Sequence, residues 1–304
     1  MWWRGMRWRL WRVRQLSAAD RVGLGWRDAL AASTYVHLDS IDVVEVILDD
    51  YFEASARQLR ALRSLGKEVP VLGHGVALGL ASVSAVATSR VERLAKVVNA
   101  LEPQIWSEHL AFVRSGTYEI GHLAAPPRTS STIEGAVANV ETVRRIVGTL
   151  PALENIATLI DPPASTMSEP AWVTHIMAGT GSKLLLDLHN LYANAVNFGH
   201  DPFEYLRAFP LNRVQVVHIS GGMWIELEST RRLLDDHVHD VPEIVFSMLA
   251  WLTEHCSQPL TVILERDGHY PEFDELLRQA DRAREALASG RAKRTREAHE
   301  LAAV

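Results

Sequence analysis

The sequence predicts one α/β domain, a (β/α)8 barrel. Short apolar runs of strand length alternate along the chain with longer segments whose apolar residues have helical spacing. The length of 304 residues suits a single core of barrel size. Most of the apolar runs also close on a histidine or an acidic residue. Because strand ends meet at one face of a parallel barrel, this pattern predicts a single polar site there.

The first half of the chain supplies four strand–helix units. Residues 41–48 are rich in β-branched side chains and are bounded by charge, which is typical of a strand. Gly66 is expected to end the second helix and Pro103 to follow the third. The expected order is strand 22–25, helix 26–36, strand 41–48, helix 52–65, strand 69–73, helix 91–101, strand 105–109 and, after a long proline-bearing loop, helix 133–147.

The second half of the chain repeats this alternation. The expected elements are strand 152–155, helix 169–177, strand 184–188, helix 202–208, strand 214–219, helix 241–255, strand 260–265 and helix 273–287. Eight such units in one chain favour a closed parallel barrel over an open sheet.

Two unusual segments flank the predicted catalytic domain, residues 18–288. Residues 1–17 interleave tryptophan with five arginines and contain no acid; an upstream start or a disordered extension is favoured over contact with lipid or nucleic acid. Residues 289–304 are charged and predict a frayed helix or a disordered tail. Since the net charge is −6, the part after residue 17 is more acidic still, which argues against nucleic acid as a partner.

The single cysteine, Cys256, excludes an intramolecular disulfide framework. This fits a reducing compartment, so we expect a cytoplasmic protein. No apolar run approaches the roughly 20 residues that cross a bilayer, so no membrane span is expected. A metal site in this chain must use nitrogen and oxygen ligands, because one thiol cannot form a thiolate cluster.

Candidate metal ligands lie at the ends of the predicted strands. Histidine and carboxylate side chains are the usual nitrogen and oxygen ligands of divalent metals. Two further candidates, Asp235 and His237, lie in the predicted loop after strand 214–219, and His189 directly follows strand 184–188. The candidates at strand ends are His74, His109, Glu154, Asp187, His218 and Glu265.

The size of this set predicts two or three metal ions. Any one member alone is more simply explained as a buried histidine bonded to a carbonyl group or as an acid in an ion pair. The set as a whole resists that explanation, because several carboxylates buried together without positive charge cost several kcal/mol each. One ion does not need so many ligands, so a carboxylate, Glu154 or Glu265, is expected to bridge ions.

The ordered motifs of the chain resemble those of a known family. They are Gly23-Leu-Gly-Trp-Arg27, His74-Gly-Val76, Ser107-Glu-His-Leu-Ala111, Leu153-Glu-Asn155, Leu184-Leu-Leu-Asp-Leu-His-Asn190, Val217-His-Ile-Ser-Gly221, Asp235-Asp-His237 and Leu264-Glu-Arg-Asp267. In order and spacing they are similar to the multinuclear non-haem iron-dependent oxidative enzymes, which include the methanobactin-biosynthesis iron oxidase. The resemblance covers residues 22–287.

The resemblance implies a xylose-isomerase-like TIM barrel that holds two or three irons and uses O₂ to modify a ribosomally made precursor peptide. It implies one iron on His74, His109 and Glu154. A second would be shared by the expected catalytic residues Asp187, His218 and Glu265, and a third held by Asp235 and His237. His189 stands where many members of the family have asparagine, so its position departs from the family pattern.

The mechanism expected from this resemblance starts with a substrate cysteine thiolate bound to iron, where the cation lowers the thiol pKa. Because little sequence lies outside the predicted barrel, a separate small leader-binding partner, or a shallow leader groove on the barrel, is expected. Two alternatives stay open. One is a barrel isomerase or phosphodiesterase using a redox-inert divalent metal; the other, less favoured, is a non-catalytic scaffold that binds peptide or stores metal.

Overall fold

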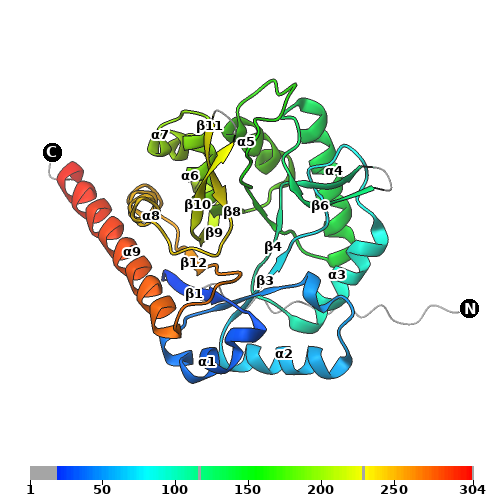
Figure 1. Ribbon diagram of the computed structural model, residues 1–304, viewed down its shortest axis with the longest axis horizontal. Coiled ribbons are helices and arrows are strands. Elements are labelled where there is room, and N and C mark those ends of the chain that lie inside the picture. Colours follow the sequence, from blue (N-terminus) through cyan, green and yellow to red (C-terminus); the bar gives the residue numbers. More distant parts are fainter. Residues whose placement is uncertain (1–18, 116–117, 228–229, 303–304) are drawn as a thin grey trace, which may run out of the picture.

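The computed structural model describes residues 19–115, 118–227 and 230–302, and it is a closed barrel of eight parallel strands surrounded by helices (Figure 1). The strand order around the barrel is β1-β12-β9-β8-β7-β4-β3-β2, so the chain winds once round the ring. The predicted fold class is therefore confirmed. The barrel strands are β1 (Arg21–Gly25), β2 (Val44–Ile47), β3 (Val71–Gly75), β4 (Trp106–His109), β7 (Ala152–Glu154), β8 (Leu184–Asp187), β9 (Val214–Ile219) and β12 (Thr261–Leu264).

Both faces of the barrel strands are buried, which explains why they read as continuous apolar runs. A small cluster packs separately from the main core; its fully buried members are Val43, Leu72, Ala152, Leu185, Val216 and Ile263. The main core brings strand side chains together with those of the surrounding helices. Apolar packing occupies these layers, and most of the buried polar residues of the barrel strands lie toward their carboxyl ends.

The surrounding helices follow the predicted alternation. Ser55 caps α2 by accepting a hydrogen bond from the amide of Gln58, so this helix starts later than predicted and continues through Gly66. The prediction that Gly66 ends the helix was wrong. The principal helices are α1 (Ala31–Val36), α2 (Ala56–Glu68), α3 (Thr88–Leu101), α4 (Ser130–Val147), α5 (Glu169–Thr180), α7 (Pro202–Arg207) and α8 (Glu243–His255).

Two helices differ from the sequence-based expectation. Helix α6 (Leu188–Asn197) begins directly after β8, because the Asp187 carboxylate accepts a hydrogen bond from the Asn190 amide and caps it. Helix α9 (Phe273–Ala302) continues through the charged segment and extends away from the barrel (Figure 1). The Trp/Arg extension at residues 1–17 lies outside the described residues.

Two antiparallel hairpins occupy segments that the sequence analysis treated as loops. β5 (Phe112–Ser115) pairs with β6 (Tyr118–Ala124) after β4, and β10 (Gly222–Leu227) pairs with β11 (Thr230–Asp235) after β9. Both hairpins follow the carboxyl ends of barrel strands, the face at which barrel active sites lie. Along the described residues, no helix combines the length and apolar character needed to cross a bilayer.

Candidate metal centre

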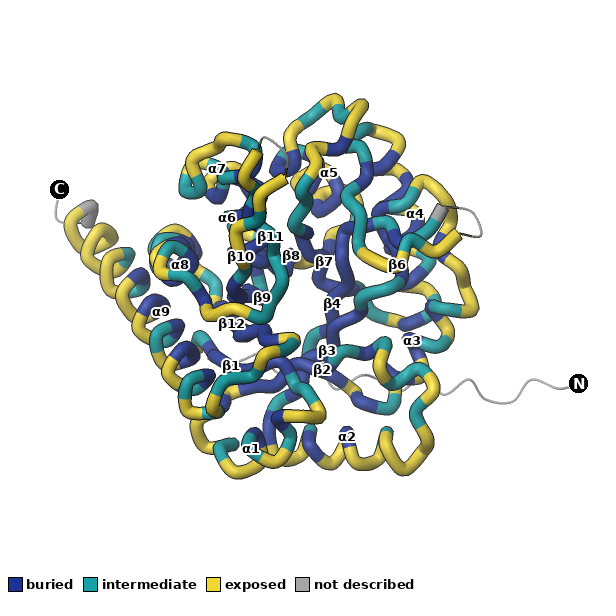
Figure 2. Tube along the Cα trace, in the orientation of Figure 1, coloured by how far each residue is buried: buried dark blue, intermediate teal, exposed yellow. Residues whose placement is uncertain are grey.

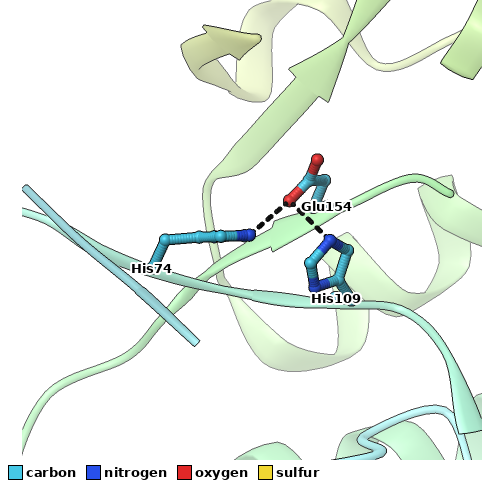
Figure 3. Close-up of side chains that lie close together, drawn as sticks. All are labelled: His74, His109 and Glu154. Carbon is cyan, nitrogen blue, oxygen red and sulfur yellow. Dashed lines mark ion pairs between the residues drawn. The ribbon is translucent and has the colours of Figure 1, made fainter. Parts of the chain in front are cut away.

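Three side chains from neighbouring strands converge at the carboxyl end of the barrel (Figure 3). His74 is the penultimate residue of the buried strand β3. His109 ends β4, and Glu154 ends β7, where it lies opposite His109. Nε2 of His74 and Nε2 of His109 lie 3.4 and 3.3 Å from the same carboxylate oxygen, Oε2 of Glu154. Ligand atoms of a tetrahedral ion with bonds of about 2.0–2.1 Å are about 3.3–3.4 Å apart. These three residues could therefore hold one metal ion.

A second group shares Glu154 with the first. Ligand atoms of Glu154, Asp187, His218 and Glu265 all lie within 4.8 Å of one another, and all four side chains are buried. Nδ1 of His218 is 3.0 Å from Oε2 of Glu265 and 3.4 Å from Oε1 of Glu154. The two oxygens of Glu154 thus face different groups, as a carboxylate that bridges two ions would require.

The remaining predicted ligands lie beside the second group. Nε2 of His237 is 2.8 Å from Oδ2 of Asp235 and 4.0 Å from Oδ2 of Asp187. Nδ1 of His189 is 2.5 Å from Oδ1 of Asp235. His237 adopts φ = 54°, a left-handed conformation that is uncommon outside glycine and is often found at functional sites. The structure thus brings every sequence-predicted ligand into one continuous cluster.

Several buried polar atoms in the cluster lack a hydrogen-bond partner among the described residues. Burying such atoms without a partner costs free energy, and a bound cation would remove that cost at the carboxylates and imidazoles together. The donor set of nitrogen and oxygen therefore fits a divalent metal. The orphaned atoms include Oε2 of Glu154, Oδ2 of Asp187 and Nε2 of His189.

Protonation of the cluster reflects its burial and its excess of carboxylates. Burial, and then the nearby Asp235, raise the pKa of Asp187 well above its usual range. Burial alone would lower the pKa of His218, but Glu265 and Glu45 overcome it and raise that pKa well above the usual value. Burial lowers the pKa of His109 to about 4, so its imidazole is neutral and ready to bind a cation.

These pKa shifts predict pH-dependent metal loading. In the metal-free protein His218 and His237 hold protons above pH 6.5, the ordinary histidine value, because Glu265 and Asp235 outweigh burial. A metal must displace those protons, so its apparent affinity should rise with pH by up to about tenfold per pH unit for each proton released. Calorimetry of Fe(II) binding under argon, in buffers of different ionisation enthalpy, checks this. Affinity that is flat above pH 6.5 would contradict it.

Hydrogen bonds from neighbouring residues orient the predicted ligands. Oγ of Ser107 lies 2.8 Å from Nδ1 of His74, which leaves Nε2 of that ring facing Glu154. The side chain of Asn155 accepts from the Asp187 amide at 2.9 Å and donates to its carbonyl oxygen at 3.0 Å. Since Oδ1 of Asp187 caps α6, Oδ2 is the oxygen left for a metal.

Glu45, on β2, is a site residue that the sequence analysis missed. Its Oε1 lies 2.8 Å from Nε2 of His218, opposite the nitrogen that faces Glu154 and Glu265. A carboxylate behind a ligand imidazole fixes the orientation of the ring and increases its basicity. Asp267 was also missed; its Oδ2 lies 3.3 Å from Nδ1 of His237, and Arg27 pairs with its other oxygen.

Replacement of Glu45 by glutamine tests this orienting role. The variant should keep the barrel but bind metal about 10–100-fold more weakly, the usual cost of losing a carboxylate behind a ligand histidine. Competition with a coloured chelator measures the affinity. Glu53→Gln is the matched control, because Glu53 is exposed and pairs only with Arg93 in the described part of the chain. Equal metal affinity of the Glu45→Gln and Glu53→Gln variants would show that Glu45 does not support the metal site.

Comparisons with solved structures show the same fold. A xylose isomerase domain protein from Alicyclobacillus acidocaldarius superimposes with a TM-score of 0.58 at 14% identity, covering 90% of this chain and 99% of that one. A structure of L-ribulose 3-epimerase gives a TM-score of 0.56 at 13% identity, covering 93% and 98%. At such low identity the likeness concerns the xylose-isomerase-like barrel alone, which the sequence analysis expected.

Proteins related in sequence align with most of this chain. A UPF0276 protein from Streptomyces avermitilis is 34% identical over 273 residues, which cover 88% of this chain but 55% of that protein. The chain thus spans about half the length of that relative. A UPF0276 protein from Caulobacter vibrioides is 29% identical over 280 residues, which cover 91% of this chain and 97% of that protein.

The family comparison gives the functional class. A family profile described as RiPP precursor modification enzyme MbnB/TglH/ChrH matches residues 21–288. RiPPs are ribosomally synthesised and post-translationally modified peptides, so the substrate class of this family is a precursor peptide. The match spans the whole barrel and includes every residue of the metal-ligand cluster. The chain therefore belongs to the MbnB/TglH/ChrH family of RiPP precursor modification enzymes.

Proposed function

We propose that this protein is a multinuclear iron-dependent enzyme that uses O₂ to modify a precursor peptide oxidatively at cysteine. The observation that carries the proposal is the sharing of Glu154 between two buried ligand groups, each able to hold an ion. Two ions placed side by side can act on one substrate atom and one co-substrate together. The ligand set proposed is His74, His109, Glu154, Asp187, His189, His218, Asp235, His237 and Glu265.

Mixed imidazole and carboxylate ligation supports iron over softer metals. Such sites suit Fe(II) and leave coordination positions open, whereas thiolate-rich sites select copper(I) or zinc. When bound, iron would coordinate the substrate thiolate and transfer electrons to O₂, which is the redox chemistry that protein side chains cannot supply.

The protein's own residues set the geometry of that chemistry. Glu154 belongs to both ligand groups and so fixes the distance between them. Glu45 orients the His218 ring, and Asn155 orients the backbone of Asp187. The second group is buried, with His218 and Asp187 fully inaccessible, so bulk water is excluded from it. Exclusion of water strengthens the electrostatic interactions inside the site and limits side reactions.

We also propose a small partner protein that binds the leader of the precursor peptide. Outside the barrel strands and their helices, the described residues offer only short hairpins for leader recognition. A shift in size-exclusion elution on mixing this chain with the product of a neighbouring gene tests the partner. Unchanged elution with every neighbouring product would place leader recognition on the barrel itself.

A turnover assay tests the proposed reaction. The iron-loaded protein is mixed with a synthetic peptide corresponding to the short open reading frame nearest its gene, and O₂ uptake and peptide mass are followed. We expect an O₂-dependent mass change that is lost when the peptide cysteine is replaced by serine. A mass change that proceeds equally without O₂, or with zinc in place of iron, would contradict the oxidative assignment and favour catalysis by a redox-inert divalent metal.

A further inference from the structure

Strand β10 presents an open edge close to the metal-ligand cluster. It begins at Gly222, whose partner in the hairpin is the predicted ligand Asp235, and it continues outward to Leu227. Among the described elements, β11 is the only one that packs extensively along it. The six residues of β10 span about 20 Å. One end of this strand therefore lies at the cluster and the other at the protein surface.

The two edges of the hairpin differ. On β11, the side chain of Asn197 accepts from the Leu233 amide at 2.7 Å and donates to its carbonyl oxygen at 2.9 Å, which closes that edge. Because those two groups point away from β10, Leu233 and its partner Trp224 form a non-hydrogen-bonded pair. The backbone groups of Trp224, and of Glu226 two residues on, thus point away from β11.

No residue of the described chain satisfies these outward groups. Neither Trp224 nor Glu226 has a backbone partner on that side within residues 19–115, 118–227 and 230–302. The strand also carries unusually large exposed apolar side chains for an open edge: Met223, Trp224 and Leu227 are 43, 40 and 41% exposed. Most of β10 is exposed (Figure 2). Natural proteins usually protect open edges with charge or proline, whereas Glu226 is the one charged residue of β10 and large exposed apolar side chains lie on both sides of it, which indicates a binding surface.

Glycine at position 222 lets this edge begin against the cluster. A Cβ atom there would lie 2.5 Å from Cε1 of His189 and 2.2 Å from the carbonyl oxygen of Leu234. Both contacts are too close for any side chain, so only glycine allows β10 to start beside a predicted ligand. A chain paired with β10 would consequently be delivered to the cluster.

We propose that the precursor peptide docks by adding an extended strand to the open edge of β10. The proposal rests on the proposed function, because a peptide substrate is the occupant that an open strand edge can bind through backbone hydrogen bonds. The outward amides and carbonyls of Trp224 and Glu226 bind the peptide backbone with little dependence on its sequence. The exposed side chains of Met223, Trp224 and Leu227 contact its apolar residues, and the peptide continues past Gly222 to the metal ligands.

A pair of substitutions at Glu226 isolates the backbone contribution. Glu226→Pro removes the outward amide and is compatible with an edge strand, whereas Glu226→Thr keeps the amide; both lose the carboxylate and its 3.7 Å contact with Arg231. The probe is a fluorescent synthetic peptide from the nearest short open reading frame, mixed with the metal-loaded full chain without O₂. Glu226→Pro should weaken binding about tenfold relative to Glu226→Thr.

Amide hydrogen exchange gives an independent readout. Bound peptide should slow exchange at the outward amides of Trp224 and Glu226, while those of Met223 and Ile225, already facing β11, change little. Equal binding by the two Glu226 variants and unchanged exchange at Trp224, with the peptide still bound and modified, would overturn docking on β10 and leave the proposed function standing. Peptide binding that slows amide exchange at Trp224 and Glu226 but not at Met223 and Ile225, without O₂-dependent modification, would support docking on β10 and contradict the proposed chemistry. A wild-type protein that neither binds nor modifies the peptide, alone or together with the proposed leader-binding partner, would overturn both.

Discussion

Alanine in place of His218 is expected to abolish peptide modification, by more than about 100-fold, while the barrel stays folded. The expected loss exceeds the usual cost of removing an outer hydrogen-bond partner, because His218 itself faces both Glu154 and Glu265 and can serve as a metal ligand. Its removal also leaves the Glu45 carboxylate buried without its imidazole partner. Peptide mass spectrometry under saturating iron and O₂ measures the effect.

His175→Ala is the matched control for this variant. His175 is an exposed residue of α5, and its ring contacts only a carbonyl oxygen of its own helix, that of Ala171, within the described chain. The control should retain wild-type turnover, and circular dichroism should show the same folded spectrum for both variants. Wild-type turnover by His218→Ala, with its metal correctly loaded, would remove His218 from the proposed catalytic residues.

Glutamine in place of Glu154 is expected to deplete both ligand groups at once. The change removes the charge of the one residue that belongs to both groups, and it replaces a ligand oxygen by an amide nitrogen that cannot bind metal. Metal content should therefore fall at both sites, and turnover should be lost. Elemental analysis after equal loading measures the content.

His109→Ala supplies the contrast that makes this result specific. His109 belongs only to the group with His74, so its removal should deplete that group and spare the one that contains His218. A Glu154→Gln protein that loses no more metal than His109→Ala would show that Glu154 is not shared between ions.

The barrel and the convergence of the candidate ligands at one face were predictable because both depend on local patterns. A strand buried on both faces reads as a short apolar run, and a parallel barrel places every run's end at the same face. His74, His109 and Glu154 could thus be placed at one face of the barrel although they are far apart along the chain, whereas their grouping around one ion was implied by the family resemblance. Their distances could not be predicted, since these depend on the strand register.

Residues that support the ligands were harder to identify. Glu45 lies within β2 among β-branched residues, so no strand end marks it; only the pairing of strands around the barrel brings it to His218. Helix α6 was not predicted, because Asp187 was assigned to metal binding alone. In the structure Oδ1 of Asp187 caps the helix and Oδ2 faces the cluster. One carboxylate can serve both purposes.

The hairpins were missed for a different reason. Apart from the buried Leu233, residues 222–227 and 230–235 carry exposed and half-buried side chains, so they lack the continuous apolar run that marked the barrel strands. Their strand structure depends on pairing with each other and on Asn197, which is distant in sequence from Leu233. Such contacts appear only once the fold is known.

The number and kind of bound ions is the most direct test of the proposed centre. The protein is expressed in medium enriched in iron-57 and purified without oxygen, and its metals are measured by elemental analysis and Mössbauer spectroscopy. Two or more irons per chain, with spectra of coupled sites, is the result expected from ligand groups that share Glu154. Zinc or manganese alone, with iron failing to load, would contradict the iron assignment and favour a metal-dependent isomerase or phosphodiesterase.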